Sequence, residues 1–181
     1  MGRKVVCYIA TSADGYIARP DGDFSWLQRH AGSSDQYGYN EFVATVDTIV
    51  WGRKTWDQVQ DFMDQAPGMG ETKSYVFTSR PETGSARPGV EYVNEPVPPF
   101  MQRLRAQPGK DVWMMGGGGI IGAFLDANEL DEFIVHVIPV LIGEGIPLIA
   151  PRHLEVPLRL LDTKRYDDGV LMLHWQVRRD G

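Results

Sequence analysis

Four consecutive glycines, Gly116 to Gly119, separate an apolar strand-like segment, 111–115, from an apolar helix-like segment, 120–125. Glycine loses more conformational freedom on folding than any other residue, so a folded chain keeps such a run where its backbone turns sharply or approaches another group closely. At the start of a helix that group is usually an anion, because the first N–H groups lack intrahelical partners and the helix dipole is positive there. The run therefore predicts a nucleotide-phosphate site. A tight turn that binds no ligand is the alternative.

Short apolar segments alternate with helix-like segments along most of the chain. Strands are expected at 5–10, 47–51, 74–77, 90–93, 112–115 and 133–138, and helices at 37–46, 53–60, 98–106 and 120–125. Two further β-like segments, 158–166 and 170–177, are joined by a Gly-containing connection that is typical of a hairpin. This order predicts an α/β fold with a mostly parallel central sheet, helices on both faces and a C-terminal antiparallel hairpin. We expect a single domain over residues 1–181.

Composition narrows the class of protein. The net charge of −6 argues against a nucleic-acid binder, which usually carries a basic face. No apolar run approaches the ~18 residues that span a bilayer, so no membrane association is expected. The single cysteine, Cys7, cannot form an intramolecular disulfide, and no signal peptide is evident, which favours a cytoplasmic location. The four histidines show no metal-ligand spacing, so no metal is expected.

Candidate anion-binding groups come directly after three of the predicted strands. The second strand is followed by Gly52, Arg53, Lys54 and Thr55, the third by Thr78, Ser79 and Arg80, and the fifth by the glycine run. Because the carboxyl ends of parallel strands share one edge of a sheet, these groups are expected to lie together. Each cation at a helix N-terminus costs roughly 0.3–1 kcal/mol of stability, because the helix dipole is positive there. A bound anion would make the same cations favourable. Alternatively, the two cations extend into water and the Thr-Ser-Arg tripeptide is an ordinary loop.

A second interpretation of the glycines is possible. Gly117, Gly119 and Gly122 satisfy the G-x-G-x-x-G fingerprint of dinucleotide-binding proteins, between a strand and a helix. A conventional Rossmann unit also has an acidic residue about 20 positions further on, and Glu144 lies 22 positions after Gly122. This alternative predicts an NAD-dependent dehydrogenase whose parallel sheet begins near Val112. A first strand at the centre of the sheet would count against it.

The whole pattern resembles the dihydrofolate reductase-like fold, and most closely the reductase domain of the bacterial riboflavin-biosynthesis deaminase–reductase. The segments that carry the resemblance are 9–18, 51–56, 116–121, 130–133 and 139–148. It implies NADPH as the hydride donor, with adenosine-phosphate contacts from 52–55 and 78–80. It further implies pyrophosphate contacts from the glycine turn through Ile120 and Ile121, nicotinamide contacts near Ala10 and Ile17, and a homodimer. The zinc signature of the deaminase is absent, so no deaminase step is expected.

Three further residues are candidates for contact with a substrate. Hydride transfer places the nicotinamide against an electrophilic carbon, and reduction of a C=N or C=O bond also needs a proton. Asp35 lies 17 positions before Gly52, near the place where dihydrofolate reductases carry a carboxylate, and is the candidate proton donor; a helix N-cap is its alternative role. Asp14 is the second catalytic candidate, or else a turn residue. Trp26 is expected to stack on a flat substrate, or else to belong to the core.

These observations predict an NADPH-dependent reductase that acts on a small pyrimidine- or pterin-like heterocycle. The resemblance suggests two types, a riboflavin-biosynthesis 5-amino-6-(5-phosphoribosylamino)uracil reductase and a dihydrofolate reductase-like enzyme. A non-catalytic nucleotide-binding protein on the same fold remains an alternative, because no carboxylate clearly takes the position of the proton donor. The Rossmann dehydrogenase described above is the other.

Overall fold

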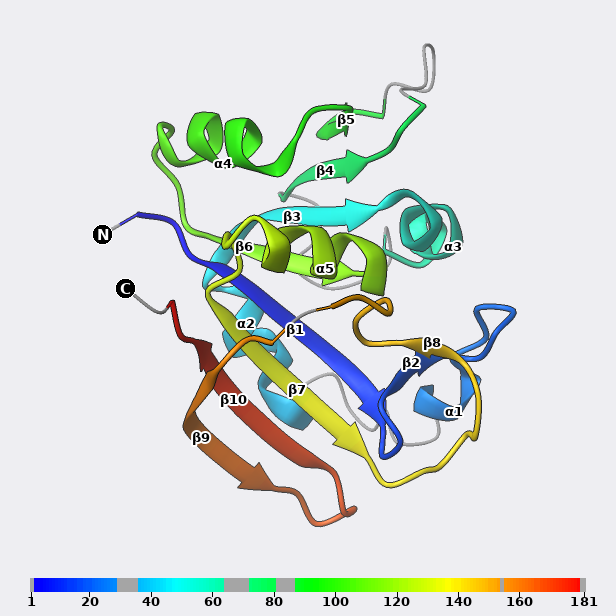
Figure 1. Cartoon of the computed structure of the whole chain (residues 1–181). Helices are drawn as coiled ribbons and strands as arrows, with labels where there is room; N and C mark the ends of the chain where they lie inside the picture. The colour runs from blue at the N-terminus through cyan, green and yellow to red at the C-terminus, as the bar shows by residue number, and fades with distance from the viewer. Residues whose placement is uncertain (1, 29–35, 64–71, 81–86, 154, 180–181) are drawn as a thin grey trace.

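The computed structural model describes residues 2–28, 36–63, 72–80, 87–153 and 155–179. Within these ranges an eight-stranded sheet has the order β5-β4-β3-β6-β1-β7-β10-β9 (Figure 1). Its strands are β1 (Val5–Ser12), β3 (Val46–Gly52), β4 (Lys73–Phe77), β5 (Val90–Val93), β6 (Asp111–Gly116), β7 (Glu132–Ile138), β9 (Leu158–Arg165) and β10 (Leu171–Val177). The strands from β5 to β7 are parallel, whereas β10 is antiparallel to both β7 and β9. The predicted mostly parallel sheet with a C-terminal antiparallel hairpin is confirmed.

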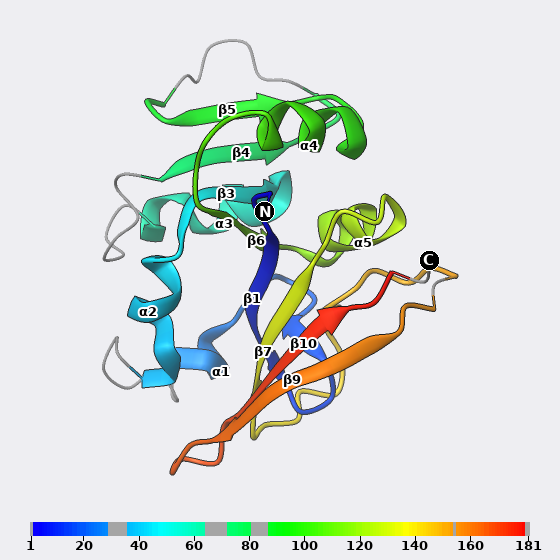
Figure 2. The same ribbon diagram turned by 90° about the vertical axis from the view of Figure 1, so that its left-hand side faces the viewer.

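Helices cover both faces of the sheet, as predicted. They are α1 (Ser25–Gln28), the 3-10 turn η1 (Gln36–Gly38), α2 (Tyr39–Val43), α3 (Arg53–Met63), α4 (Val97–Arg105) and α5 (Gly118–Asp126). Figure 2 shows α4 and α5 on one side of the sheet and α2 and α3 on the other. Side chains alternate along β1 because successive residues of a strand point to opposite faces: Val5 and Cys7 join the core under α4 and α5, and Val6 joins the core under α2 and α3.

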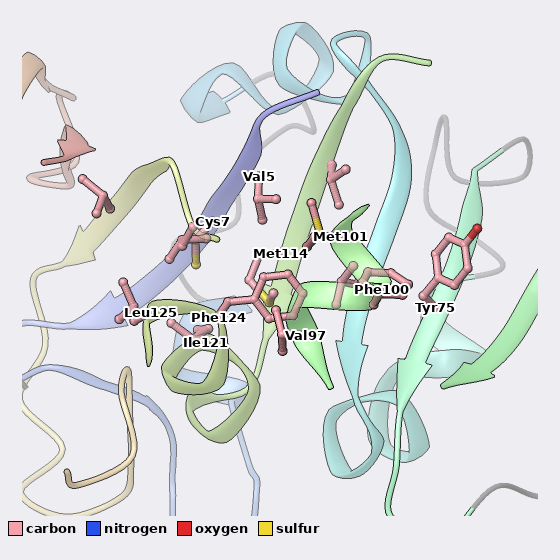
Figure 3. Packing of buried hydrophobic residues seen from close by; sticks show 14 of the residues in the cluster. Val5, Cys7, Tyr75, Val97, Phe100, Met101, Met114, Ile121, Phe124 and Leu125 are labelled. Atoms are coloured by element: carbon pink, nitrogen blue, oxygen red, sulfur yellow. The ribbon is translucent and has the colours of Figure 1, made fainter. Parts of the chain in front are cut away.

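Aromatic and aliphatic side chains fill the core beneath α4 and α5. Phe100 and Phe124 pack near Met114, and Phe100 meets Tyr75 edge to face with 5.0 Å between ring centroids (Figure 3). Helix α4 begins with proline in its first turn, where a missing N–H costs no intrahelical bond, and it ends with two arginines in its last turn, which suits the helix dipole. This packing fixes α5 against the sheet and so fixes the position of the glycine turn that precedes it.

Three short elements were not predicted from the sequence. Tyr16–Ala18 forms β2, which pairs with β8 (Ile146–Pro147), in a region expected to be a loop. Strands of three and two residues are too short to show a periodic pattern. Helix α1 has only four residues and was missed for the same reason. The helix expected at 37–46 is confined to α2, because Tyr37 and Gly38 adopt left-handed φ values of 72° and 75° and β3 begins at Val46.

The order of the strands argues against the alternative of a conventional Rossmann dehydrogenase. Strand β1 lies between β6 and β7, inside the sheet, and β6 is flanked by β3 and β1. A sheet that began near Val112 would not place the first strand of the chain there. The match of Gly117, Gly119 and Gly122 to the fingerprint is therefore coincidental. In the described part of the chain, no helix has the length and the apolar content that crossing a bilayer requires.

Candidate active site

The structure brings the three predicted anion-binding segments to one edge of the sheet. Strand β3 pairs in parallel with both β4 and β6, so that Gly52 lies opposite Phe77 and Trp51 lies opposite Gly116. Residues 52–55, 78–80 and 116–119 begin at these positions or directly after them. They therefore leave the sheet side by side at the carboxyl ends of its strands, the edge at which α/β proteins bind ligands.

The glycine turn passes very close to the end of β3. Gly116 has a φ of 103°, a conformation that favours glycine, and the peptide bond between Gly116 and Gly117 is cis. A β-carbon on Gly52 would lie 3.3 Å from Ile120 Cγ2 and 3.5 Å from the backbone nitrogen of Gly117. Small residues on both segments thus allow the two backbones to approach each other.

The first turn of α5 is covered on one side and open on the other. A β-carbon on Gly118 would lie 2.5 Å from the carbonyl oxygen of Pro147, and the N–H of Ala150 donates to Gly118 O at 3.1 Å. In contrast, a β-carbon on Gly119 would have no atom within 4 Å. The first N–H groups of a helix have no intrahelical acceptor and the dipole is positive there. The open side is therefore suited to an anion such as a pyrophosphate.

Two side chains flank the turn at Gly117. A β-carbon at this position would lie 3.0 Å from Thr55 Oγ1, at the start of α3, and 3.6 Å from Ile17 Cδ1, on β2. A hydroxyl group and an apolar side chain thus lie on either side of the turn. Ile120 is half-buried, Ile121 is fully buried, and both donate their N–H groups to Gly117 O. Any contact of these two residues with a cofactor would come mainly from the side chain of Ile120.

The two cations at the start of α3 differ in their surroundings. Arg53 Nε donates to Asp57 Oδ1 at 2.8 Å, one helical turn further on, and its guanidinium lies 5.5 Å from the centroid of Tyr92. Its charge is therefore matched within its own helix, and a bound phosphate would have to compete with Asp57. Lys54 is exposed. The prediction that both cations contact the cofactor is compatible with this geometry, but Arg53 does not depend on an anion for its charge partner.

The segment after β4 forms a turn closed by a threonine side chain. Thr78 Oγ1 accepts the N–H of Arg80 at 3.1 Å, an arrangement common in loops. Ser79 and Arg80 are exposed. Arg80 thus follows two hydroxyl-bearing residues at the carboxyl end of β4, and its contact with a 2′-phosphate stays a prediction.

The carboxylate of Asp14 is bound to backbone N–H groups of another loop. Gly143 N donates to Asp14 Oδ2 at 2.8 Å, and Ile142 N does so at 3.2 Å. A hydrogen bond from Ser12, followed by those from Gly143 and Ile142, lowers the pKa of this carboxyl group. Asp14 therefore joins the loop after β1 to the loop after β7, and this geometry supports a positioning role rather than the predicted catalytic one. Asp35, the predicted proton donor, lies outside the described residues.

Trp26 is buried in a small cluster next to the end of β1. Its side chain packs with Ile138 and Val170, and partly buried residues that include Ala10 and Tyr37 surround them. Only 3% of Trp26 is exposed, so little of its ring is available for the predicted stacking on a substrate. Its Nε1 is buried and has no hydrogen-bond partner among the described residues. Trp26 thus belongs to the wall behind the site.

His136 and Tyr37 form a polar contact on the same side that sequence reasoning missed. His136 lies beside Ala10 in the parallel pairing of β7 with β1. The carbonyl oxygen of Tyr37 accepts a hydrogen bond from Tyr8 Oη at 2.9 Å and lies 3.1 Å from His136 Nε2. Burial lowers the pKa of His136 to about 4, so the ring is neutral near pH 7. The sequence showed only a histidine that interrupts an apolar run, with no local sign of these partners.

A cavity of about 400 Å³ opens at the opposite edge of the sheet, near the amino ends of the parallel strands. Its lining includes Leu125 in the last turn of α5, Asn128 after that helix, and Val177 and Arg178 at the end of β10. None of the predicted site residues lines it. The arrangement of backbone and side chains at the carboxyl edge, and not this cavity, therefore defines the candidate site.

The sheet order, the antiparallel C-terminal hairpin and the glycine turn at the carboxyl edge define a dihydrofolate reductase-like protein. A dihydrofolate reductase from Enterococcus faecalis superposes with a TM-score of 0.63 over 97% of each chain, at 14% sequence identity. The chain belongs to the RibD C-terminal domain family, whose profile matches residues 3–172. This membership indicates an oxidoreductase and confirms the resemblance noted from the sequence.

Relatives cover almost the whole chain. The uncharacterized protein YwjB of Bacillus subtilis is 39% identical over 175 residues, which are 97% of this chain and 98% of that protein. A solved protein of Shewanella sp. PV-4, assigned to riboflavin biosynthesis, has a TM-score of 0.85 and 25% identity, and the match covers 99% and 100% of the two chains. RibD of Acinetobacter baumannii has a TM-score of 0.77 and 19% identity, and the match covers 98% of this chain but 59% of that one.

Proposed function

We propose that this protein is an NADPH-dependent reductase that transfers a hydride to a small pyrimidine- or pterin-like heterocycle. The observation that carries the proposal is the open side of the α5 N-terminus at Gly119, which lies at the same edge as the exposed Arg80 and the hydroxyl group of Thr55. A dinucleotide needs these groups together: helix N–H groups for its pyrophosphate and a cation for a further phosphate.

Similarity to known proteins supports the same chemistry. A solved protein of Thermotoga maritima, with a TM-score of 0.73 and 15% identity, is described as a diaminohydroxyphosphoribosylaminopyrimidine deaminase and 5-amino-6-(5-phosphoribosylamino)uracil reductase. The dihydrofolate reductase of Enterococcus faecalis was solved with NADP(H). Sequence identities of this size indicate a common fold, so the cofactor and the substrate of the present chain belong to the proposal.

Each part of NADPH can be assigned to a segment of the chain. Residues 52–55 and 78–80 would hold the adenosine phosphates, and the glycine turn would hold the pyrophosphate. The nicotinamide would lie between Ile17 and the end of β1 at Ala10, where apolar surface excludes water from the reacting carbon. NADPH supplies the hydride, and the protein orients the ring and the substrate against each other.

Reduction of a C=N or C=O bond also requires a proton. Asp35 remains the predicted donor. Asp14 joins the loop after β1 to the loop after β7 through its bonds to Ile142 and Gly143, next to the place where the nicotinamide would lie. The two aspartates would therefore have different roles: Asp14 would position the site, and Asp35 would contact the substrate.

We also propose a cytoplasmic homodimer. The outer strand β9 is exposed along its whole length, and Leu158 and Leu160 are 43% and 54% exposed. Leu171, on the neighbouring strand, is 41% exposed. Exposed leucines on an edge strand favour association with a second chain. The single buried Cys7 is consistent with a reducing compartment.

The proposal is tested by titrating the protein with NADPH and with NADH while recording tryptophan fluorescence. We expect quenching at micromolar NADPH, and we expect Arg80→Ala to weaken NADPH far more than NADH. Arg178→Ala, at the opposite edge, is the matched control and should change neither affinity. Absence of binding by either cofactor would contradict the proposal. Binding without NADPH oxidation in the presence of dihydrofolate or ribosylamino-pyrimidines would instead favour the non-catalytic alternative.

A further inference from the structure

Gly122 follows the glycine run but has no place in the proposed cofactor site. A β-carbon on it would overlap the guanidinium of Arg152, with Cζ and the two Nη atoms almost equally close. The guanidinium therefore lies with its flat face on the backbone of α5. Because the φ of Gly122 is not in the left-handed region, alanine would fit the backbone and would favour the helix. The contact with Arg152 is thus what requires a glycine here.

Arg152 also contacts α5 one turn further on. Its Nη1 donates to Asp126 Oδ2, and its Nε donates to the carbonyl oxygen of Ala150 at 3.2 Å. Only 21% of the Arg152 side chain is exposed. Gly118, Gly122 and Asp126 follow one another at intervals of four residues and so lie on one face of the helix. Arg152 covers the later part of this face.

The preceding residues cover the earlier part of the same face. Residues 146–152, which we call the strap, begin with β8 and pass beside α5 (Figure 1). At the first turn of the helix, a β-carbon on Gly118 would lie 2.5 Å from Pro147 O, and Ala150 N donates to Gly118 O at 3.1 Å. The strap is therefore attached to α5 at two places, the first turn and the surface around Gly122.

The strap also supports β2. Its first two residues, β8, pair with β2, and Leu148 N donates to Gly15 O at 3.1 Å. Ile17 lies in the middle of β2, and its Cδ1 would be 3.6 Å from a β-carbon on Gly117. The strap therefore connects the helix that would bind the pyrophosphate with the strand that would border the nicotinamide.

We propose that Arg152 is a positioning residue for the cofactor: it holds the strap against α5 and thereby fixes Ile17 relative to the pyrophosphate site. The inference rests on the proposed function and adds a residue that acts on that site through the strap. Arg152 does not itself bind a phosphate in this arrangement, because its guanidinium faces the second turn of α5 and its charge is matched by Asp126. Since a small displacement of a bound ring weakens its contacts and its alignment, loss of Arg152 should affect mainly the nicotinamide.

The first measurement uses the ligand-free protein and follows hydrogen exchange of the N–H groups of Leu148 and Ala150, which bind the strap to β2 and α5. Arg152→Ala removes the guanidinium. Gly122→Ala leaves Arg152 in the chain but places a methyl group where its guanidinium lies, so the guanidinium must move away. Both variants should exchange these amides about tenfold faster than the wild type, because the strap opens more often. Arg178→Ala, at the opposite edge, is the control and should leave the exchange unchanged.

The second measurement compares the binding of NADPH with that of adenosine 2′,5′-bisphosphate, which lacks the nicotinamide half. The bisphosphate would contact only residues 52–55 and 78–80, which the strap does not carry. In Arg152→Ala and in Gly122→Ala, Kd for NADPH should rise about tenfold and Kd for the bisphosphate should change less than about twofold. Adding Gly122→Ala to Arg152→Ala should change neither constant further, since the guanidinium is already gone, and should raise Tm because alanine favours the helix.

Faster exchange without a selective loss of NADPH affinity would overturn the inference, because Arg152 would then only stabilise the fold. Equal losses for the two ligands, or additive losses from the two substitutions, would also overturn it. Each of these outcomes leaves the proposed function intact, because the wild type still binds NADPH. If the wild type binds neither NADPH nor the bisphosphate, the proposed function itself fails, and the inference fails with it.

Discussion

Adding a methyl group at Gly119 tests the pyrophosphate site without disturbing the fold. Its β-carbon would have no atom within 4 Å, and its φ is not in the left-handed region. Replacing glycine by alanine at a compatible position stabilises a protein by about 0.4–1 kcal/mol, mainly by restricting the unfolded chain. In a protein of 181 residues, 1 kcal/mol shifts Tm by roughly 2–4 °C. Gly119→Ala should therefore raise Tm by about 1–4 °C.

The same substitution should weaken cofactor binding. The added methyl group would occupy the open side of the α5 N-terminus, where a pyrophosphate would approach the first N–H groups. We expect the Kd for NADPH to rise at least tenfold, which is about 1.4 kcal/mol. Thermal unfolding measures the first effect, and tryptophan fluorescence titration measures the second. The combination of higher stability with weaker binding is the signature of a glycine kept for a ligand.

Gly118→Ala is the matched comparison. A β-carbon there would lie 2.5 Å from the backbone oxygen of Pro147, so the backbone itself must shift. Overpacking of this kind costs about 1–3 kcal/mol, and Tm should fall. An unchanged NADPH affinity in Gly119→Ala, with Tm raised, would refute the pyrophosphate site. A fall in Tm like that of Gly118→Ala would show that the side described as open is occupied.

Four further outcomes are expected. Asp14→Asn should make the loop after β7 more sensitive to limited proteolysis. Because folding lowers the pKa of Asp14, the wild type should also lose the bonds from this carboxylate to the loop as the pH falls below about 4. Burial lowers the pKa of His136 to about 4, so below pH ~6.5 the unfolded chain takes up a proton before the folded protein does. The free energy of unfolding, measured with urea, should therefore fall by up to about 3 kcal/mol between pH 6.5 and pH 4. In His136→Gln it should depend less on pH. Phe100→Ala, fully buried, should cost about 3–5 kcal/mol in urea unfolding, against almost none for the exposed Leu141→Ala. Leu160→Asp should give a monomer in analytical ultracentrifugation and a lower Tm, because association stabilises the folded chain, whereas a dimer would contradict the proposed interface.

Much of the fold could be predicted from local pattern. Residues 5–10 of β1 form a continuous apolar run, β5 was placed at its observed bounds, and the hairpin of β9 and β10 was marked by a glycine in its turn. These elements are predictable because a strand buried on both faces requires a run of apolar residues, and a tight turn favours glycine. The β2–β8 pair left no such trace, since its partners are more than a hundred residues apart and each is two or three residues long.

Some residues of the candidate site could likewise be predicted from local sequence, and some of its contacts could not. The glycine run, Thr55 and Arg80 were predicted because each follows a strand, and parallel pairing gathers strand ends at one edge; their contact with a cofactor stays a prediction. The pairing of Arg53 with Asp57 and the binding of Asp14 to the loop at Gly143 were not anticipated. Trp26 was assigned to the substrate, but its environment is set by Ile138 and Val170, far away in the sequence.

The sequence alone determined the class of architecture and predicted the edge proposed for the nucleotide, because both depend on the order of the strands and on the residues directly after each strand. Only the tertiary structure decided that β6, the strand before the glycine turn, lies between β3 and β1, so that this strand does not begin a Rossmann sheet. The physical reason is that burial and turns impose a pattern on neighbouring residues, whereas residues far apart in the sequence that meet in the folded chain impose none.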